Sequence, residues 1–290
     1  MKDDGSTDHT VSIVKDYAHK WPNVRLVQNE QNLGITKNFI SGFFLAQGDY
    51  IAYSDQDDVW HPQKLELLLE AIGDGNMAYS NSAICDVDGQ YIAPLMKEPP
   101  LVSELISLLD LTIWGHQILF KKEILYGNDV YTLARSIWLD SLIPILAFKQ
   151  DNNNVVYVHQ ALVNWRRHPN ASGKDDLAKV RFTPPLFFKL KKYFNIVPSV
   201  LSWFDKKKRD NTKRFYKKMK GIEGLSKEAY VLIDLMSACR FVDVTRAGLL
   251  CERQYRRNHT NLSLRLKLRL FLKPFFVIRN QSKGITGDIN

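Results

Sequence analysis

The sequence predicts an α/β protein, in which a mostly parallel sheet flanked by helices is followed by a basic, mainly helical C-terminal region. Short apolar runs alternate with amphipathic stretches through the first half of the chain, as in sheets whose strands are joined by helices. The run at residues 50–53 stops abruptly at a group of carboxylates, as expected of a buried strand that reaches the edge of its sheet. After residue 181, basic clusters and longer helical patterns replace this alternation.

Local signals predict the individual elements in order. Turn and N-cap residues precede the first helix, Trp21-Pro22 ends it, and Gly48 stops the second helix. A third helix has leucine and isoleucine along one face, and an Asp-Gly turn closes the strand after it. We expect helices at 10–19, 35–46, 62–72 and 101–109, one or two helices within 226–250, and strands at 24–28, 50–53, 77–87 and 155–158. Residues 262–272 alternate as a strand would, but their basic, leucine-rich composition favours a helix.

Charge is distributed unevenly along the 290 residues. Residues 1–180 hold 15 Lys and Arg against 23 Asp and Glu, whereas residues 181–290 hold 25 against 8. We therefore predict an acidic catalytic domain at 1–180 and a basic helical region at 181–290. The basic region would face an anionic partner, which could be a membrane surface, nucleic acid or a polyphosphate. The three cysteines lie far apart without metal-binding spacing, which fits a reducing cytoplasm.

The carboxylate group at 55–58 is the strongest local signal for chemistry. Asp55, Asp57 and Asp58 follow the apolar run directly, and like charges packed this tightly need solvent or a cation to compensate them. In an extended chain, Asp55 and Asp57 would project to the same side, about 6.5 to 7 Å apart. Such hard oxygen ligands suit Mg²⁺ or Mn²⁺. The competing interpretation is a solvated acidic loop that precedes a helix with Pro62 in its first turn.

A second carboxylate stands out because its surroundings are apolar. Asp140 lies within residues 138–148, which are otherwise apolar except for Ser141. A carboxylate in such a context is a candidate for a perturbed pKa and hence for acid–base chemistry. The alternative is a helix N-cap, a common position for aspartate.

Four sequence blocks together resemble the family-two, inverting glycosyltransferases with the GT-A fold, and most closely the rhamnosyltransferase-like branch that builds bacterial surface polysaccharides. The blocks are DDGSTDHT at 3–10, NLGITKNF at 32–39, SDQDDVWHPQKLE at 54–66, and Asp140 with WRRH at 165–168. The resemblance covers roughly residues 1–180.

The resemblance implies a role for each matching residue. Asp140 would be the catalytic base, with Leu139 in place of the histidine that often precedes it. The metal ligands would be Asp57 and His168. The nucleotide sugar would be held by Asp3, Asp4, Asp55, Arg166 and Arg167. The acceptor side would be lined by Trp114, His116 and Gln117.

The implied reaction transfers a sugar, with rhamnose as the family-level expectation, from a nucleotide-diphosphate donor to a growing surface polysaccharide or lipid-linked acceptor. A bound Mg²⁺ or Mn²⁺ would stabilise the leaving diphosphate while the base takes the proton of the acceptor hydroxyl. We expect a cytoplasmic protein, with a peripheral position at the inner face of the cell membrane through residues 181–290 as an option.

Two other functional classes remain open. The family normally has a strand, a helix and a second strand before the DDGS block, so we expect an N-terminally truncated chain whose first strands are missing. A truncated chain could be an inactive remnant that acts only as a partner or assembly module. The basic, aromatic-containing region would also suit a nucleic-acid-binding protein, but it carries no recognised binding motif, and we expect no specific nucleic acid partner.

Overall fold

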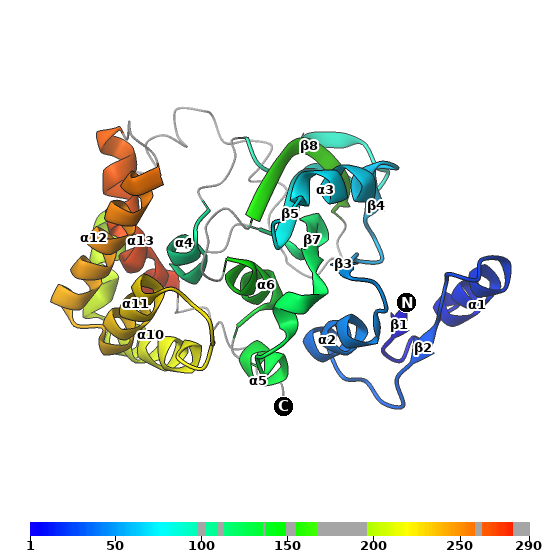
Figure 1. Cartoon of the computed structure of the whole chain (residues 1–290), viewed down its shortest axis with the longest axis horizontal. Helices are drawn as coiled ribbons and strands as arrows, with labels where there is room; N and C mark the ends of the chain where they lie inside the picture. The colour runs from blue at the N-terminus through cyan, green and yellow to red at the C-terminus, as the bar shows by residue number, and fades with distance from the viewer. Residues whose placement is uncertain are drawn as a thin grey trace.

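The computed structural model describes residues 1–97, 102–109, 113–135, 137–148, 155–167, 196–258 and 263–280. They form an α/β part around a six-stranded sheet and a helical part on one side of it (Figure 1). The expected α/β fold class with a helical C-terminal region is confirmed.

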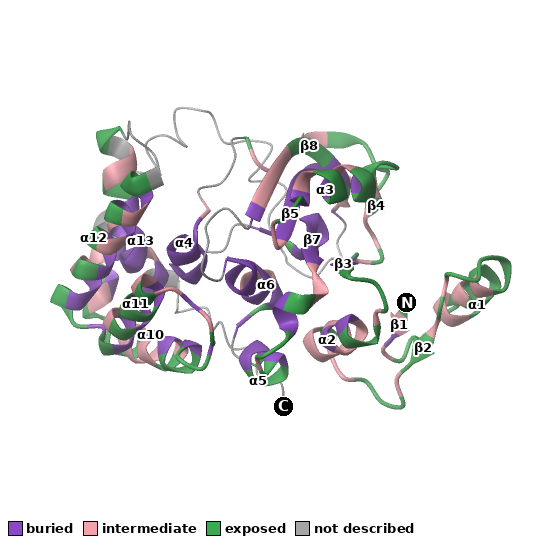
Figure 2. Ribbon diagram, viewed as in Figure 1, coloured by how far each residue is buried: buried purple, intermediate pink, exposed green. Residues whose placement is uncertain are grey.

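The N-terminal segment forms a small unit of its own. Its strands β1 (Lys2–Asp3) and β2 (Val27–Gln28) pair in parallel as a two-stranded sheet, joined by helix α1 (Thr10–Lys20). Helix α2 (Ile35–Leu45) then leads towards the main sheet and buries Ile40 and Phe43. Helix α1 has no buried residue (Figure 2).

The main sheet has the strand order β3-β7-β5-β8-β4, with β6 paired to β5. These strands are β3 (Tyr50–Ala52), β4 (Val59–Trp60), β5 (Met77–Cys85), β6 (Tyr91–Pro94), β7 (Ile118–Lys121) and β8 (Val155–Arg166). Only β5 and β8 pair in parallel, and the other described pairs in this sheet are antiparallel. The prediction of a mostly parallel sheet was therefore wrong. Strands β3 and β5 do run in the same direction, as the helix between them requires, but β7 lies between them in the opposite direction.

Strand β5 is the centre of the fold, because all nine of its residues are buried. On one side of the sheet, Ala78 packs with Leu68 and Ile72 of helix α3 (Lys64–Ile72). On the other side, Met77 and Tyr79 belong to the largest cluster of buried apolar residues. That cluster also takes in helices α4 (Glu104–Leu109), α5 (Val130–Ala134) and α6 (Leu139–Ala147), and the short turn η2 (Lys122–Leu125).

The C-terminal helices continue the same core instead of forming a separate one. They are α9 (Ile196–Leu201), the short turn η4 (Ser202–Phe204), α10 (Lys206–Met219), α11 (Lys227–Ala238), α12 (Phe241–Asn258) and α13 (Leu264–Asn280). Helix α4 is their contact with the α/β part: Tyr216 donates a hydrogen bond to the carbonyl of Leu108 (2.8 Å), and Glu104 accepts one from the backbone N–H of Ser226 (2.9 Å). The predicted boundary at residue 180 lies outside the described residues.

Most expected elements are present, although their lengths differ. The 226–250 stretch forms two helices, and 262–272 is helical within α13, as favoured. The strand expected at 155–158 extends to Arg166 because it pairs along the whole of β5. Asp140 is not the N-cap of α6, a position that Trp138 occupies. Among the described helices, none is both long enough and apolar enough to cross a membrane.

The crossing of α12 and α13 depends on a glycine, which gives a first prediction. A Cβ on Gly248 would lie 2.1 Å from the carbonyl oxygen of Phe271. We expect Gly248→Ala to lower the free energy of unfolding by about 1–3 kcal/mol, because the two helices would have to move apart. Gly42→Ala is the matched control, since it lies within α2 with no atom near the added methyl group. It should stabilise by about 0.5–1 kcal/mol. Equal effects of the two changes in denaturant unfolding would contradict this account.

Candidate functional site

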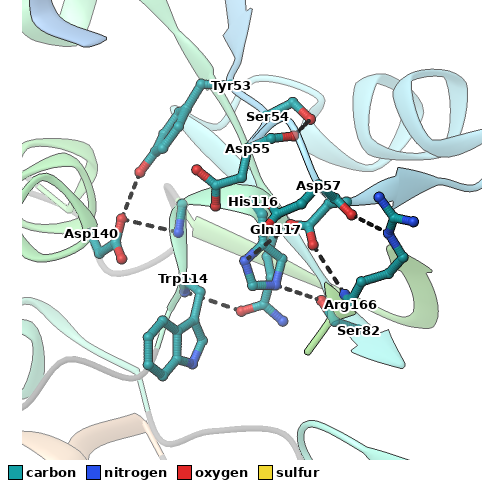
Figure 3. A network of polar contacts seen from close by, with 12 residues as sticks. Tyr53, Ser54, Asp55, Asp57, Ser82, Trp114, His116, Gln117, Asp140 and Arg166 are labelled. Carbon is teal, nitrogen blue, oxygen red and sulfur yellow. Dashed lines mark hydrogen bonds and ion pairs between the residues drawn. The ribbon is translucent and has the colours of Figure 1, made fainter. Parts of the chain in front are cut away.

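The acidic loop begins where β3 ends. Tyr53 is the last buried side chain of this segment, and the loop that carries Asp55, Asp57 and Asp58 follows it before β4. Figure 3 shows Asp55 and Asp57 beside the turn η1 (Gly115–Gln117), which precedes β7. Because β7 pairs with β3, the acidic loop and this turn lie at the same end of two neighbouring strands.

Asp58 and His116 face each other inside this site. The Oδ2 atom of Asp58 lies 3.9 Å from Nδ1 of His116, and both side chains are almost fully buried. Burial and the nearby Lys64 lower the pKa of His116 to about 3, so the ring is neutral and this contact is not an ion pair at pH 7. Its Nε2 atom lies 3.0 Å from the hydroxyl of Ser82. With Nε2 protonated and donating to Ser82, Nδ1 keeps a lone pair directed at the acidic loop.

Three potential ligand atoms converge here. One atom each from Asp55, Asp58 and His116 lie within 4.8 Å of one another. Burial, followed by the neighbouring carboxylates, raises the pKa of Asp55 to about 6 and that of Asp58 to about 7. The Oδ2 atom of Asp58 is buried and accepts no hydrogen bond from any described residue. Two carboxylates and a neutral imidazole therefore fit a divalent cation, which would supply the missing positive charge.

A buried lysine supplies part of that charge. Lys64, in α3, is fully buried and donates a hydrogen bond to the backbone carbonyl of His116 (2.8 Å). Its ammonium group also lies 3.5 Å from the centre of the Trp60 ring. Burial lowers the pKa of Lys64 to about 7, while Asp58 acts in the opposite direction. The lysine thus holds the 115–117 turn against the acidic loop.

Asp140 lies beside this cluster, in the first turn of α6. Its Oδ1 atom accepts hydrogen bonds from the hydroxyl of Tyr53 (2.9 Å) and from the backbone N–H of Gly115 (3.1 Å; Figure 3). Burial raises the pKa of Asp140, and these two hydrogen bonds partly offset the rise. The predicted base and the acidic loop are therefore brought together, linked through Tyr53 and Gly115.

The three residues expected on the acceptor side differ in their surroundings. Gln117 is fully buried: its Nε2 donates to the carbonyl of Ser80 (2.7 Å), and its Oε1 accepts from the N–H of Trp114 (3.1 Å). His116 faces Asp58, as described above. Only Trp114 of the three is exposed (41%), and its ring packs against Trp165 with the ring centres 5.4 Å apart.

The arginine pair lies at the end of β8. Arg166 donates from Nε to the backbone carbonyl of Asp57 (2.5 Å), and its own N–H donates to Oδ1 of Asp58 (3.3 Å). Arg167 is buried and stacks over the Trp165 ring, with its Cζ 4.4 Å from the ring centre. These contacts bring Arg166 to the acidic loop. The predicted metal ligand His168 lies outside the described residues.

The aspartates at the end of β1 hold the N-terminal loops and lie outside the network of Figure 3. Asp3 accepts hydrogen bonds from the backbone N–H groups of Gly5 and Ser6 (both 3.3 Å) and from the Ser6 hydroxyl, and that hydroxyl contact is the main cause of its lowered pKa. The carboxylate of Asp4 accepts from the N–H groups of Leu33 (2.7 Å) and Gly34 (2.8 Å). Asp4 thus connects the first two sequence blocks.

Sequence reasoning gave no role to three residues of this site and a different role to a fourth, His116. Asp58 was counted as one of three carboxylates but not as a ligand, and Tyr53 and Lys64 were treated as ordinary elements of a strand and a helix. His116 was expected at the acceptor, not beside Asp58. The position of His116 in the sequence was a usable signal. It lies two residues before the buried strand β7, and the start of β7 lies at the same end of the sheet as the acidic loop. No local pattern marks Tyr53 or Lys64, since their partners are 87 and 52 residues away.

Comparisons with known proteins find that this chain is similar to glycosyltransferases. Residues 2–126 match the model of glycosyl transferase family 2. An uncharacterized glycosyltransferase of Haemophilus influenzae is 36% identical over 92 residues, which are 31% of this chain and 37% of that protein. The dTDP-rhamnosyl transferase RfbG of Shigella flexneri is 32% identical over 90 residues, which are 29% of this chain and 31% of that protein. The matched stretch thus spans about a third of each of these relatives.

A solved structure shows the same fold over nearly the whole chain. The crystal structure of S. aureus TarS 1-349 in complex with UDP-GlcNAc superposes with a TM-score of 0.50 at 14% identity, covering 97% of this chain and 81% of that one. Its GT-A-like fold agrees with the mixed sheet and flanking helices found here. Residues 2–126 of this chain are therefore similar to glycosyltransferase family 2, and the chain as a whole has a GT-A-like fold.

Proposed function

We propose that this protein transfers a sugar from a nucleotide-diphosphate donor to an acceptor hydroxyl, with inversion at the anomeric carbon. The observation that carries the proposal is the position of Asp140, a single carboxylate of raised pKa held next to the Asp55–Asp58–His116 cluster. Inversion by direct displacement needs one base and no covalent intermediate, which a single carboxylate provides.

Asp140 takes the proton of the attacking hydroxyl in this reaction. Its raised pKa brings its basicity closer to neutral pH, while the flanking hydrogen bonds to Oδ1 leave Oδ2 for the acceptor. Asp55, Asp58 and His116 would hold Mg²⁺ or Mn²⁺, which supplies positive charge against the departing diphosphate when bound. Asp57 and His168 remain proposed ligands, with Asp57 in the same loop.

The nucleotide end of the donor would lie along the remaining predicted residues. Arg166 reaches the acidic loop from β8 and is well placed for a phosphate oxygen, and Arg167 follows it. Asp3 and Asp4 would act mainly by holding the loops that meet the base, because their carboxylates already accept backbone N–H groups. The similarity to a dTDP-rhamnosyl transferase supports dTDP-rhamnose as the first donor to test.

The acceptor would enter past Trp114. This side chain is exposed directly beside Gly115, whose N–H holds the base, so it lies where the attacking hydroxyl must arrive. The packed Trp114–Trp165 pair offers a flat apolar surface of the kind that the C–H face of a sugar ring can cover. Together with the family match, this supports a saccharide acceptor, such as a growing surface polysaccharide or a lipid-linked sugar.

The basic helices would contact an anionic membrane surface. Phe204 (64% exposed) and Phe241 (43% exposed) flank the ring of Trp203, each 5.2 Å away between ring centres. We call Phe204 and Phe241, with Trp203 between them, the aromatic patch; Leu201 and Val242, their near neighbours in sequence, are also exposed apolar residues. Helix α10 starts directly after Phe204 with three lysines and an arginine. In such an arrangement the apolar side chains can enter the apolar interior of a membrane, while the basic side chains contact its anionic headgroups.

Activity tests the proposal directly. Purified wild-type protein with Mn²⁺ should hydrolyse or transfer the sugar of dTDP-rhamnose or UDP-GlcNAc, followed by mass spectrometry. Asp140→Asn should lower the rate by about 10²–10⁴-fold, because it removes the base. Asp74→Asn is the matched control, since this exposed loop aspartate lies outside the site and should leave the rate unchanged. Inactive wild-type protein would favour a non-catalytic partner role, and an active Asp140→Asn variant would remove Asp140 as the base.

Cation binding can be tested without turnover. Mn²⁺ or Mg²⁺ at about ten times its dissociation constant should raise the midpoint of thermal unfolding by roughly 3 °C, because the cation binds only the folded cluster. Asp58→Asn should remove most of this rise. It should also raise the midpoint in the absence of metal, since it deletes a buried carboxylate oxygen without a described partner. A full metal-induced rise in Asp58→Asn would contradict this assignment, and Asp74→Asn again serves as the control.

Membrane contact can be tested with vesicles. We expect the protein to co-sediment with vesicles that contain phosphatidylglycerol, and less with pure phosphatidylcholine, because the patch is rimmed by basic residues. The double change Phe204→Ser and Phe241→Ser should weaken binding roughly tenfold by removing apolar surface that enters the bilayer. Tyr91→Ser, an exposed aromatic of β6, is the matched control. Equal binding of the double variant and the wild type would rule out this patch.

A further inference from the structure

Asp140 is held in an asymmetric way. The hydroxyl of Tyr53 and the backbone N–H of Gly115 both donate to the same atom, Oδ1, at 2.9 and 3.1 Å. No described residue donates a hydrogen bond to Oδ2. Rotation of the carboxylate about its Cβ–Cγ bond would break both hydrogen bonds. The two donors therefore fix the direction in which Oδ2 points.

We propose that Tyr53 is a positioning residue for the catalytic base: it fixes Oδ1 of Asp140 and so presents Oδ2 to the acceptor hydroxyl. This inference rests on the proposed function, in which Asp140 takes the proton. Tyr53 itself need not touch either substrate, because it acts through Asp140. Figure 3 shows its ring reaching from the end of β3 to the carboxylate, beside Asp55.

The Tyr53 ring is fixed by its surroundings. It is buried between Phe39 and Phe43, each with its ring centre 5.2 Å from that of Tyr53. Both phenylalanines come from α2, so this helix holds the ring against the sheet. Burial, followed by the charge of Asp140, raises the pKa of Tyr53 well above its usual value. A phenolic hydroxyl is protonated at neutral pH, so it can donate to Oδ1 of Asp140 there.

Glycine at position 115 makes this contact possible. A Cβ on Gly115 would lie 2.1 Å from the Tyr53 hydroxyl oxygen and 2.2 and 2.3 Å from Cε2 and Cζ of its ring. Any side chain at 115 would push the ring away from Asp140. Residue 115 thus contributes twice, since its N–H is the second donor to Oδ1 and its missing side chain makes room for the first.

The arrangement also affects the basicity of Asp140. Tyr53 and Gly115 stabilise its charged form, against the effect of burial. Among the described residues, the other titratable group that interacts with this carboxylate is Asp55, two residues after Tyr53. Without the Tyr53 hydroxyl, the pKa of Asp140 should rise, and the base should become protonated at a higher pH than in the wild type.

The test is Tyr53→Phe, assayed across pH with the donor that the wild type turns over. We expect kcat to fall about ten- to a hundredfold because the carboxylate is no longer oriented. The acidic limb of the pH–rate profile should move to higher pH, because the hydrogen bond that lowers the pKa of Asp140 is lost. The KM for the nucleotide sugar should stay unchanged. Gly115→Ala should give the same shift by displacing the ring.

Tyr79→Phe is the matched control. Tyr79 is buried in the same apolar cluster, but its hydroxyl has no hydrogen-bond partner among the described residues. Its removal should change neither kcat nor the pH profile. An unshifted profile with unchanged kcat in Tyr53→Phe, measured beside an inactive Asp140→Asn, would overturn the positioning role while leaving the proposed function in place.

A measurement without turnover separates the test of the Tyr53–Asp140 contact from the test of sugar transfer. If wild-type protein transfers no sugar, the proposed function fails, but the Tyr53–Asp140 contact can still be measured by unfolding. Tyr53→Phe should lower the unfolding midpoint more in the wild-type background than in Asp140→Ala, because only the former loses the hydrogen bond. Equal shifts in the two backgrounds would show that the contact does not hold the carboxylate.

Discussion

The structure around the site depends on the burial of like charges. Asp55 and Asp58 lie together at the end of β3 in surroundings that disfavour their charged forms. Lys64 is the buried cation beside them, and it is fixed by the His116 carbonyl and the Trp60 ring. The acidic loop and the 115–117 turn are therefore tied to one ammonium group. The three potential ligand atoms that converge there could hold a second positive charge.

The central strand carries the polar contacts that shape this space. Strand β5 is buried along its whole length, yet it offers the Ser80 carbonyl to Gln117 and the Ser82 hydroxyl to His116. A buried polar atom without a partner costs stability, so these contacts favour one conformation of the 114–117 turn. That conformation sets both the His116 ring opposite Asp58 and the Gly115 N–H that donates to Asp140.

Features that depend on local sequence could be predicted, whereas those that depend on long-range pairing could not. Helix and strand positions follow from local periodicity, and the grouping of the acidic loop with Asp140 followed from family blocks whose order is preserved. The antiparallel insertion of β7 could not be predicted, because alternation of elements does not determine which strand pairs with which. The partners of Tyr53 and Lys64 could not be predicted either, since both contacts join residues far apart in the sequence and depend on the finished sheet.

Helix α4 connects the chemistry to the surface that would meet a membrane. It packs with α6, which carries Asp140, and its Glu104 and Leu108 accept hydrogen bonds from the C-terminal helices. Because one buried apolar cluster runs through all of these elements, the aromatic patch and the base belong to one packed body. A protein bound to a membrane through this patch would therefore present Asp140 at a constant orientation. Such geometry suits an acceptor whose reactive hydroxyl is itself held at the membrane surface.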